Sequence, residues 1–159
     1  METPREAIQN FLAHNRIAMV GISRNPTDFS AKLFEEFCRL GYDMVPVNPG
    51  AQEIHARRSF ARLQDVRPPV TAALLMTSPK VTEAVVHDCA EAGVQSVWMY
   101  RSHGQGSISA QAVEFCREQG ITVVPGECPF MFLPQTGAVH RFHGFVRKIT
   151  GRYPRASAA

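Results

Sequence analysis

The feature that most constrains this chain is an alternation of short apolar runs with longer amphipathic runs that end at glycine. The apolar runs favour β-strands, and the amphipathic runs have the apolar spacing of helices. The predicted strands are residues 17–20, 44–47, 70–76, 94–100 and 121–124, and the predicted helices are residues 4–14, 30–40, 79–92, 108–119 and 136–149. Strands that alternate with helices form βαβ units. The sequence therefore predicts an α/β fold, a Rossmann-like doubly wound parallel sheet of about five strands with helices on both faces.

Two details place individual strands in that sheet. The third and fourth strands, 70–76 and 94–100, are apolar on both faces, as is typical of strands buried between two helix layers. Pro46 lies inside the second strand and removes one backbone donor, which predicts a position near an edge of the sheet or at a strand end.

Composition limits the class of protein. With 159 residues, 45% of them hydrophobic and 19% charged, the chain is predicted to form one domain over residues 1–159, with a core at about 15–130 and a C-terminal helix at about 136–150. No apolar run approaches the roughly 20 residues of a membrane span, so no membrane partner is expected. The four cysteines form no CxxC pair and the N-terminus is not a signal peptide, which predicts a cytoplasmic location. A net charge of +3 is too small to indicate a nucleic-acid partner.

The residues that follow the strands predict where a ligand binds, because sheets of this kind bind ligands beyond the carboxyl ends of their strands. Gly21 follows the first strand, but the dinucleotide pattern GxGxxG is absent and Ser23 stands at its second glycine. Ser30 is expected to cap the next helix, and the cations Arg24 and Lys32 flank its start. This arrangement suits a phosphate-rich anion. The alternative is that both cations are solvated surface charges and that Ser30 is only a cap.

The end of the second strand argues against NAD. A site for NAD places a carboxylate there to bind the ribose hydroxyls, whereas Val47 is followed by Asn48 and Pro49, with no carboxylate before Glu53. NADP stays open because two arginines follow at 57 and 58, although such a pair is more often a solvated turn.

A set of short motifs in this order resembles the small CoA-binding proteins of the succinyl-CoA synthetase α-subunit type, over about residues 17–129. The motifs are Val20-Gly21-Ile22-Ser23-x-x-Pro26, Ser30-x-Lys32, Gly41-Tyr42, Val45-Pro46-Val47-Asn48-Pro49, Ser59-Phe60-x-x-Leu63-x-Asp65-Val66, Ser78-Pro79, Ala92-Gly93, Val97-Trp98, Gly120, Val123-Val124 and Cys128-Pro129. Each motif is weak alone, but their order and spacing together are fairly specific.

The resemblance implies a domain that binds coenzyme A or an acyl-CoA through its ADP moiety, at the carboxyl edge of the sheet. It assigns phosphate contacts to the first turn, adenosine contacts to the end of the second strand, closure of the pocket to the third, and the pantetheine path to the fourth. The residues it implies are Gly21, Ile22, Ser23, Arg24, Pro26, Ser30, Lys32, Val47, Asn48, Pro49, Met76, Thr77, Ser78, Pro79, Met99 and Tyr100. The family often carries a basic residue after the Asn-Pro pair, where this chain has Gly50.

The resemblance also implies binding without turnover. The synthetase requires a second domain with a phosphorylated histidine and a partner subunit, and this chain shows no such region. The expected role is a carrier, a sensor or a partner subunit, with a homo-oligomer or a protein partner left open.

Two rival functions remain. One is an NADP-dependent reductase or a small acyl-CoA enzyme that uses Cys128 or His103, although a Cys-Pro turn is more often structural. The other is a protein-interaction module that works through the apolar run 130–133 and the last helix. His140 and His143 share a helix face, but no spacing supplies a further metal ligand. Cys38, Cys89 and Cys116 are expected to be small buried hydrophobes.

Overall fold

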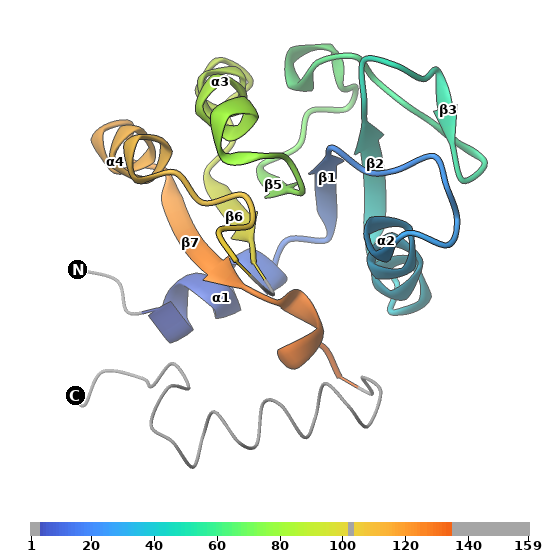
Figure 1. Ribbon diagram of the computed structural model, residues 1–159, viewed down its shortest axis with the longest axis horizontal. Coiled ribbons are helices and arrows are strands. Elements are labelled where there is room, and N and C mark those ends of the chain that lie inside the picture. Colours follow the sequence, from blue (N-terminus) through green and yellow to red (C-terminus); the bar gives the residue numbers. More distant parts are fainter. Residues whose placement is uncertain (1–3, 102–103, 135–159) are drawn as a thin grey trace.

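A five-stranded parallel sheet forms the centre of the computed structural model, which describes residues 4–101 and 104–134 (Figure 1). Its strand order is β2-β1-β5-β6-β7, so the strand that starts the sheet along the chain lies inside it. The strands are β1 (Arg16–Val20), β2 (Asp43–Val47), β5 (Ala72–Leu75), β6 (Ser96–Tyr100) and β7 (Thr122–Glu127). The predicted Rossmann-like α/β fold is confirmed.

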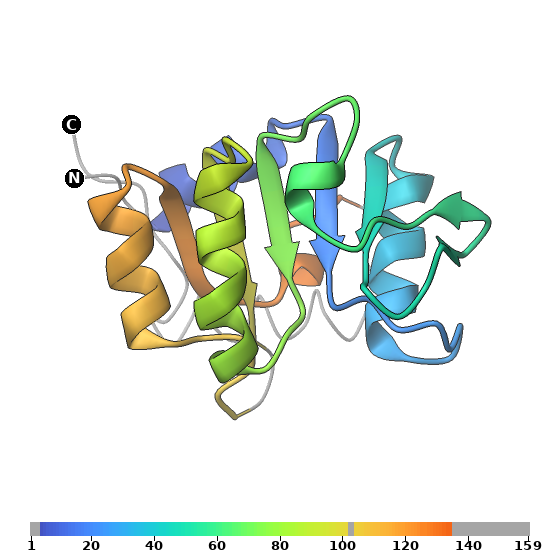
Figure 2. The same cartoon turned by 90° about the horizontal axis from the view of Figure 1, so that it is seen from above.

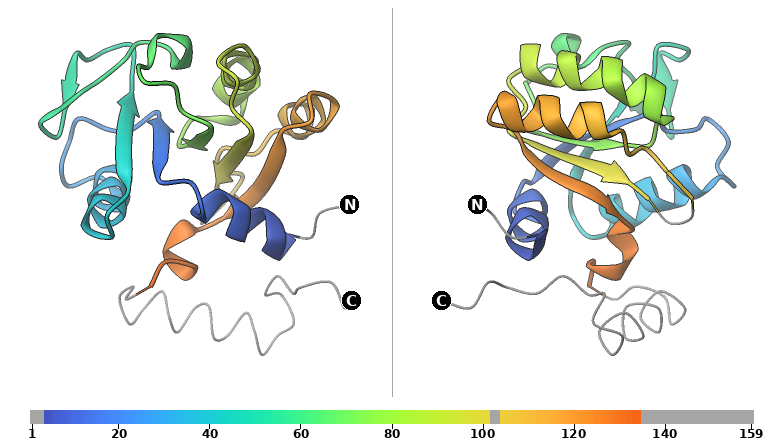
Figure 3. Two further views of the ribbon diagram at one scale, coloured as in Figure 1. Left: turned by 180° about the vertical axis from the view of Figure 1, so that it is seen from behind. Right: turned by 60° about the vertical axis from the view of Figure 1, so that its left-hand side comes forward.

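Helices cover both faces of the sheet, as predicted (Figure 2). One face packs against α1 (Pro4–Leu12) and α2 (Phe29–Arg39), and the other against α3 (Pro79–Glu91) and α4 (Ala110–Glu118). Seen from behind, α1 crosses β6 and β7 (Figure 3). None of the helices in the described ranges is both long and apolar enough to cross a membrane.

The two core layers follow from the alternation of side chains along the strands. Leu74 joins the layer under α1 and α2, and its neighbour Leu75 joins the layer under α3 and α4. All four residues of β5 are buried, which confirms the prediction from its two apolar faces. Trp98 of β6 is fully buried and meets the Phe11 ring edge-on at 5.2 Å, while its indole N–H donates to the Glu127 carbonyl. Its one polar group is therefore satisfied inside the core.

Both edge strands contain a proline. Pro46 lies in β2 and Pro125 in β7, and each of these strands pairs with one neighbour in the sheet. The predicted edge position of Pro46 is confirmed, because a residue without an N–H fits a strand only where that donor is not needed.

Several predicted boundaries shift. The third strand is shorter than 70–76, and β7 extends past 124 to Glu127 because a register shift at Met99/Tyr100 continues its pairing with β6. The helix predicted over 136–149 lies outside the described residues.

The crossover from β2 to β5 departs most from the sequence-based expectation. It has no α-helix but carries an antiparallel ribbon of β3 (Glu53–Ile54) and β4 (Arg57–Arg58), then a short 3-10 helix over Leu63–Asp65. The two arginines that suggested a solvated turn form strand β4 instead. The turn itself is His55-Ala56, with φ of 50° and 57°, which is the backbone of a tight two-residue hairpin.

Candidate functional site

The strand order reverses at β1 and β5, so the ends of these strands mark the expected ligand crevice. Gly21, directly after β1, has φ +82°, and a Cβ built on it would lie 2.9 Å from Thr77 Cγ2 and 3.1 Å from the Met76 carbonyl. The Gly21 N–H donates to the Val47 carbonyl at 3.1 Å. A residue with a side chain could therefore not bring the ends of β1, β2 and β5 together in this way.

The loop from Gly21 to the start of α2 runs along this edge of the sheet (Figure 2). The Ser23 N–H donates to Ser30 Oγ at 2.9 Å, and Ser23 Oγ accepts the Asn25 N–H at 3.1 Å. The expectation that Ser30 caps α2 is wrong, because the N-cap is Asp28. Ser30 lies inside the first turn, and its hydroxyl holds the loop rather than the helix end.

Asp28 is a functional candidate that the sequence analysis missed. Its carboxylate makes no capping bond to α2 and instead accepts the Ser23 hydroxyl and the Asn25 side-chain amide. Two exposed cations, Arg24 and Lys32, flank it, and neither forms an ion pair with a described residue. An anion at this loop would meet two positive charges and one negative charge.

Asn48 connects the end of β2 to this loop. Its side-chain amide donates to the Ile22 carbonyl at 3.0 Å, and its Oδ1 accepts the Gly50 N–H at 2.8 Å. Pro49 follows and is exposed. Asn48 therefore stands where a NAD site has a carboxylate, and its side chain joins the backbone of the first loop to the backbone after β2.

The end of β5 brings a second helix start to the same edge. Ser78 is the N-cap of α3 and is exposed, and Pro79 occupies the first helical position. The hydroxyls of Thr77 and Thr82 lie 2.7 Å apart, which fixes the Thr77 side chain under the Gly21 backbone. Two helix N-termini, those of α2 and α3, therefore flank the crevice.

Three residues implied by the resemblance have side chains inside the core. Ile22 and Met99 are fully buried and Val47 is 2% exposed. The side chain of Met99 packs under α3 and α4, so the expected border of a ligand path at this residue stays a prediction about its backbone. Any ligand contact of these three must come from the backbone.

Aromatic rings close the other side of the crevice. Tyr100, at the end of β6, lies 5.2 Å from the Phe29 ring of α2, and Phe29 lies 5.5 Å from the Phe130 ring. The apolar run 130–133, one candidate for an interaction surface, packs against the core layer under α1 and α2 instead, with Leu133 5% exposed.

Two further residues at this edge lacked a sequence signal. His55, at the tip of the β3–β4 ribbon, places its Nε2 3.1 Å from the Ser23 carbonyl and so joins the ribbon to the first loop. Ser107 is buried and donates its hydroxyl to the Leu75 carbonyl at 2.9 Å. Neither residue belongs to a recognisable sequence pattern. The position of His55 depends on the path of the β2–β5 crossover, and that of Ser107 depends on the loop after β6 folding back toward β5.

The cysteines differ in burial. Cys128 is 4% exposed, Cys89 and Cys116 are fully buried, and Cys38 is partly exposed. The prediction of small buried hydrophobes is confirmed for Cys89 and Cys116 and is wrong for Cys38. Burial raises the pKa of Cys116 to about 11 and raises that of Cys89 further. His103, His140 and His143 lie outside the described residues. Within the described ranges, no group of three metal-ligating side chains occurs.

Known proteins resemble the chain over the part that builds this site. The model of a family described as "CoA binding domain" matches residues 15–134. The uncharacterized protein YneT of Bacillus subtilis (strain 168) is 25% identical over 130 residues, covering 80% of this chain and 93% of YneT.

Solved structures give the same architecture. A hypothetical protein from Pyrococcus horikoshii OT3 matches with a TM-score of 0.73 and 23% identity, over 80% of this chain and 87% of that chain. An acetyl-coenzyme A synthetase 1 of Ca. Korarchaeum cryptofilum matches with a TM-score of 0.60 and 23% identity, over 69% of this chain and 25% of that chain. At these identities the likeness establishes the fold alone.

Proposed function

Since the chain belongs to the CoA-binding domain family, we propose that it binds coenzyme A or an acyl-CoA through the ADP moiety, at the carboxyl edge of β1, β2 and β5. The proposal includes no catalytic step by this chain alone. The protein then acts as a carrier, a sensor or a partner subunit.

The close approach at Gly21 is the observation that carries the proposal. It lets the ends of β1 and β5 meet at the point where the strand order reverses, so the starts of α2 and α3 lie at one edge of the sheet. These two helix starts can then face an anion directly, which is how helix N-termini hold phosphate groups. The loop that follows is braced by Ser30, Asn48 and His55, so little order has to be gained on binding.

Charge supports a ligand with several phosphates. Arg24, in the loop, and Lys32, near the start of α2, are exposed, and the negative charge of Asp28 opposes them. A diphosphate with a further phosphate has enough charge to recruit both cations despite the carboxylate. Asn48, in place of a ribose-binding carboxylate, favours CoA over NAD.

The burial of Cys128 supports a non-catalytic role. A thiol that is 4% exposed is a poor nucleophile for a bound thioester, because attack requires an accessible thiolate. Burial therefore favours the structural interpretation of the Cys-Pro turn.

The test is a calorimetric titration of the purified protein, freed of ligand, with CoA, dephospho-CoA, NADP and NAD. We expect micromolar binding of CoA and clearly weaker binding of the other three. A loss of affinity for dephospho-CoA would assign the 3′-phosphate to Arg24 or Lys32. The variants R24Q and K32Q should each weaken CoA binding by about fivefold, the size of one charge-assisted contact.

The matched control is R117Q, which removes an exposed arginine on α4 whose ion pair with Glu114 is long, at 3.9 Å. This variant should bind CoA as the parent protein does. Binding of NADP but not CoA would replace the proposal with a reductase. A folded protein that binds none of the four ligands would favour the protein-interaction module.

A further inference from the structure

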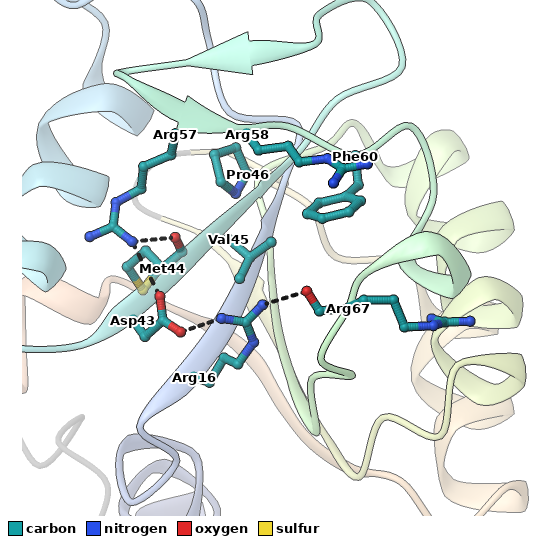
Figure 4. A pocket seen from close by; sticks show the side chains of 9 residues that line it. All are labelled: Arg16, Asp43, Met44, Val45, Pro46, Arg57, Arg58, Phe60 and Arg67. Atoms are coloured by element: carbon teal, nitrogen blue, oxygen red, sulfur yellow. Dashed lines mark hydrogen bonds and ion pairs between the residues drawn. The ribbon is translucent and has the colours of Figure 1, made fainter.

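A second charged hollow lies along β2 and runs from the start of β1 and β2 to the β3–β4 ribbon and Phe60, which bridges to Val47 (Figure 4). We call it the arginine groove and define it by Arg16, Asp43, Arg57, Arg58, Phe60 and Arg67. Its volume is about 270 Å³. Arg16 and Asp43 are paired at the start of β1 and β2. These five-residue strands span about 13 Å, so this end of the groove lies well away from the carboxyl edge.

The lining of the groove is locally basic. It holds four arginines and one aspartate, a surplus of +3. A surplus of this size in one hollow attracts anions.

Part of this charge is already neutralised inside the groove. The Asp43 carboxylate accepts hydrogen bonds from Arg16 and from Arg57, the latter at 3.2 Å. Arg16 also donates to the carbonyls of Pro68 and Arg67. Arg67 in turn donates to the carbonyls of Gln64 and Val66. Arg16 and Arg67 thus hold the walls together and have little capacity left for a ligand.

Arg57 and Arg58 supply the free capacity. Arg57 uses its Nη1 for Asp43 and the Met44 carbonyl, which leaves its other guanidinium nitrogens to bind an anion. Arg58 makes no ion pair with any described residue, and its guanidinium lies over the Phe60 ring, 4.9 Å from the centroid. Glu53 lies directly opposite Arg58 in the β3–β4 ribbon, and its carboxylate could compete with a ligand for the Arg58 guanidinium.

The floor between these two arginines is apolar. Figure 4 shows Val45 and Pro46 of β2 between Arg57 and the Phe60 ring. Val45 and Pro46 are themselves buried, so the half-buried Phe60 ring supplies the apolar surface that a small apolar or aromatic body of a ligand would contact. The volume limits that body to about the size of one ring.

We propose that the arginine groove binds a small organic phosphate, with its phosphate at the free guanidinium of Arg58 and its apolar body against the Phe60 ring, toward Arg57. A phosphate ester carries −1.5 to −2 charges at neutral pH, which suits the surplus charge better than a single carboxylate. A second copy of this chain is a poor occupant, because a symmetric contact would bring two positive grooves together. This site uses none of the side chains proposed to bind CoA, although the Phe60 carbonyl accepts the Asn48 N–H at 2.9 Å.

The test uses phenyl phosphate as the probe, with inorganic phosphate and phenol as its two halves, followed by calorimetry and by amide chemical shifts. We expect saturable binding of phenyl phosphate, weaker binding of each half, and shifts in β2 and β4. The variant R58Q should weaken phenyl phosphate binding at least about fivefold and leave CoA binding unchanged. R117Q, the matched exposed arginine on α4, should leave both unchanged.

Three results would overturn the proposal. The first is the absence of saturable binding at millimolar phenyl phosphate. The second is binding that R58Q does not weaken more than R117Q does. The third is displacement of phenyl phosphate by CoA from the same amides, which would make the groove part of the CoA site. Inorganic phosphate that binds as tightly as phenyl phosphate would overturn the role of the apolar floor.

Discussion

The carboxyl edge of β1 and β5 and the arginine groove on β2 are both suited to anions, but they are built in opposite ways. The carboxyl edge relies on backbone groups and short side chains, with a glycine at the closest approach and Ser30 and Asn48 as braces. The arginine groove relies on long side chains, two of which are used up in holding its walls.

This difference predicts how each site responds to change. A site made of backbone should be lost when any side chain occupies the space of the glycine, whereas loss of one flanking charge should only weaken it. A site made of arginines should lose affinity with one guanidinium and with salt, while its fold is unaffected. The following variants separate the two behaviours.

The largest effect should come from G21A. The added Cβ would meet Thr77 and the Met76 carbonyl at 2.9 and 3.1 Å, and φ of +82° is strained for alanine. We expect a loss of about 3 kcal/mol in the free energy of unfolding, measured by urea denaturation, and loss of CoA binding.

G41A is the matched control for this variant. Gly41 has φ +93°, but no atom lies within 4 Å of its built Cβ, so only the backbone strain remains. It should cost about 1 kcal/mol and leave both ligand sites intact. Equal losses in the two variants would show that the close approach at Gly21 contributes nothing.

S30A tests the brace of the first loop. The variant removes the acceptor of the Ser23 N–H, so we expect CoA affinity to fall by about fivefold, the effect of about 1 kcal/mol. Calorimetry on S96A provides the comparison, because Ser96 Oγ is buried without a hydrogen-bond partner in the described structure. If S96A weakened CoA as much as S30A, the loop bond would have no specific role.

D28N should act in the opposite direction. It removes a negative charge beside the proposed phosphate site while keeping a side chain that can hydrogen-bond to Ser23 and Asn25. We expect CoA to bind about threefold more tightly at low salt. E35Q, an exposed neutralisation further along α2, should change CoA affinity much less. Unchanged or weaker binding by D28N would place the phosphates away from this loop.

The smallest effect should be on the rate at which the Cys38 thiol is alkylated, because the charge of Arg57 in the arginine groove affects the pKa of that thiol. Burial raises the pKa of this thiol, and the charge of Arg57 partly opposes the rise. R57Q removes that opposition, so the thiolate should form at higher pH and labelling at fixed pH should slow by about twofold. Peptide mapping after brief alkylation would measure it.

Cys116 is the internal control for this labelling, because burial raises its pKa to about 11 and no groove residue contributes. It should stay unlabelled in both proteins. R24Q, at the other site, should leave the rate at Cys38 unchanged, and a faster rate in R57Q would contradict the electrostatic assignment.

The fold and the carboxyl edge were predictable because their signals are local. Apolar runs that end in glycine or proline mark the strand ends, and parallel strands bring those ends to one edge. What escaped prediction depended on choices between similar residues, such as Asp28 rather than Ser30 as the cap of α2. The arginine groove had no sequence pattern at all, since Arg16 and Arg58 meet only through a crossover without an α-helix.

The prolines in the two edge strands limit how copies of this protein can assemble. Two sheets join edge to edge through backbone hydrogen bonds between their edge strands. A strand that docked beside Pro46 or Pro125 would lack one of these bonds, because proline has no N–H to donate. A continuous sheet across two molecules is therefore disfavoured at both sides. If the protein forms a dimer, its interface should be made of helix faces and loops, and each five-stranded sheet should end at its own edge strands.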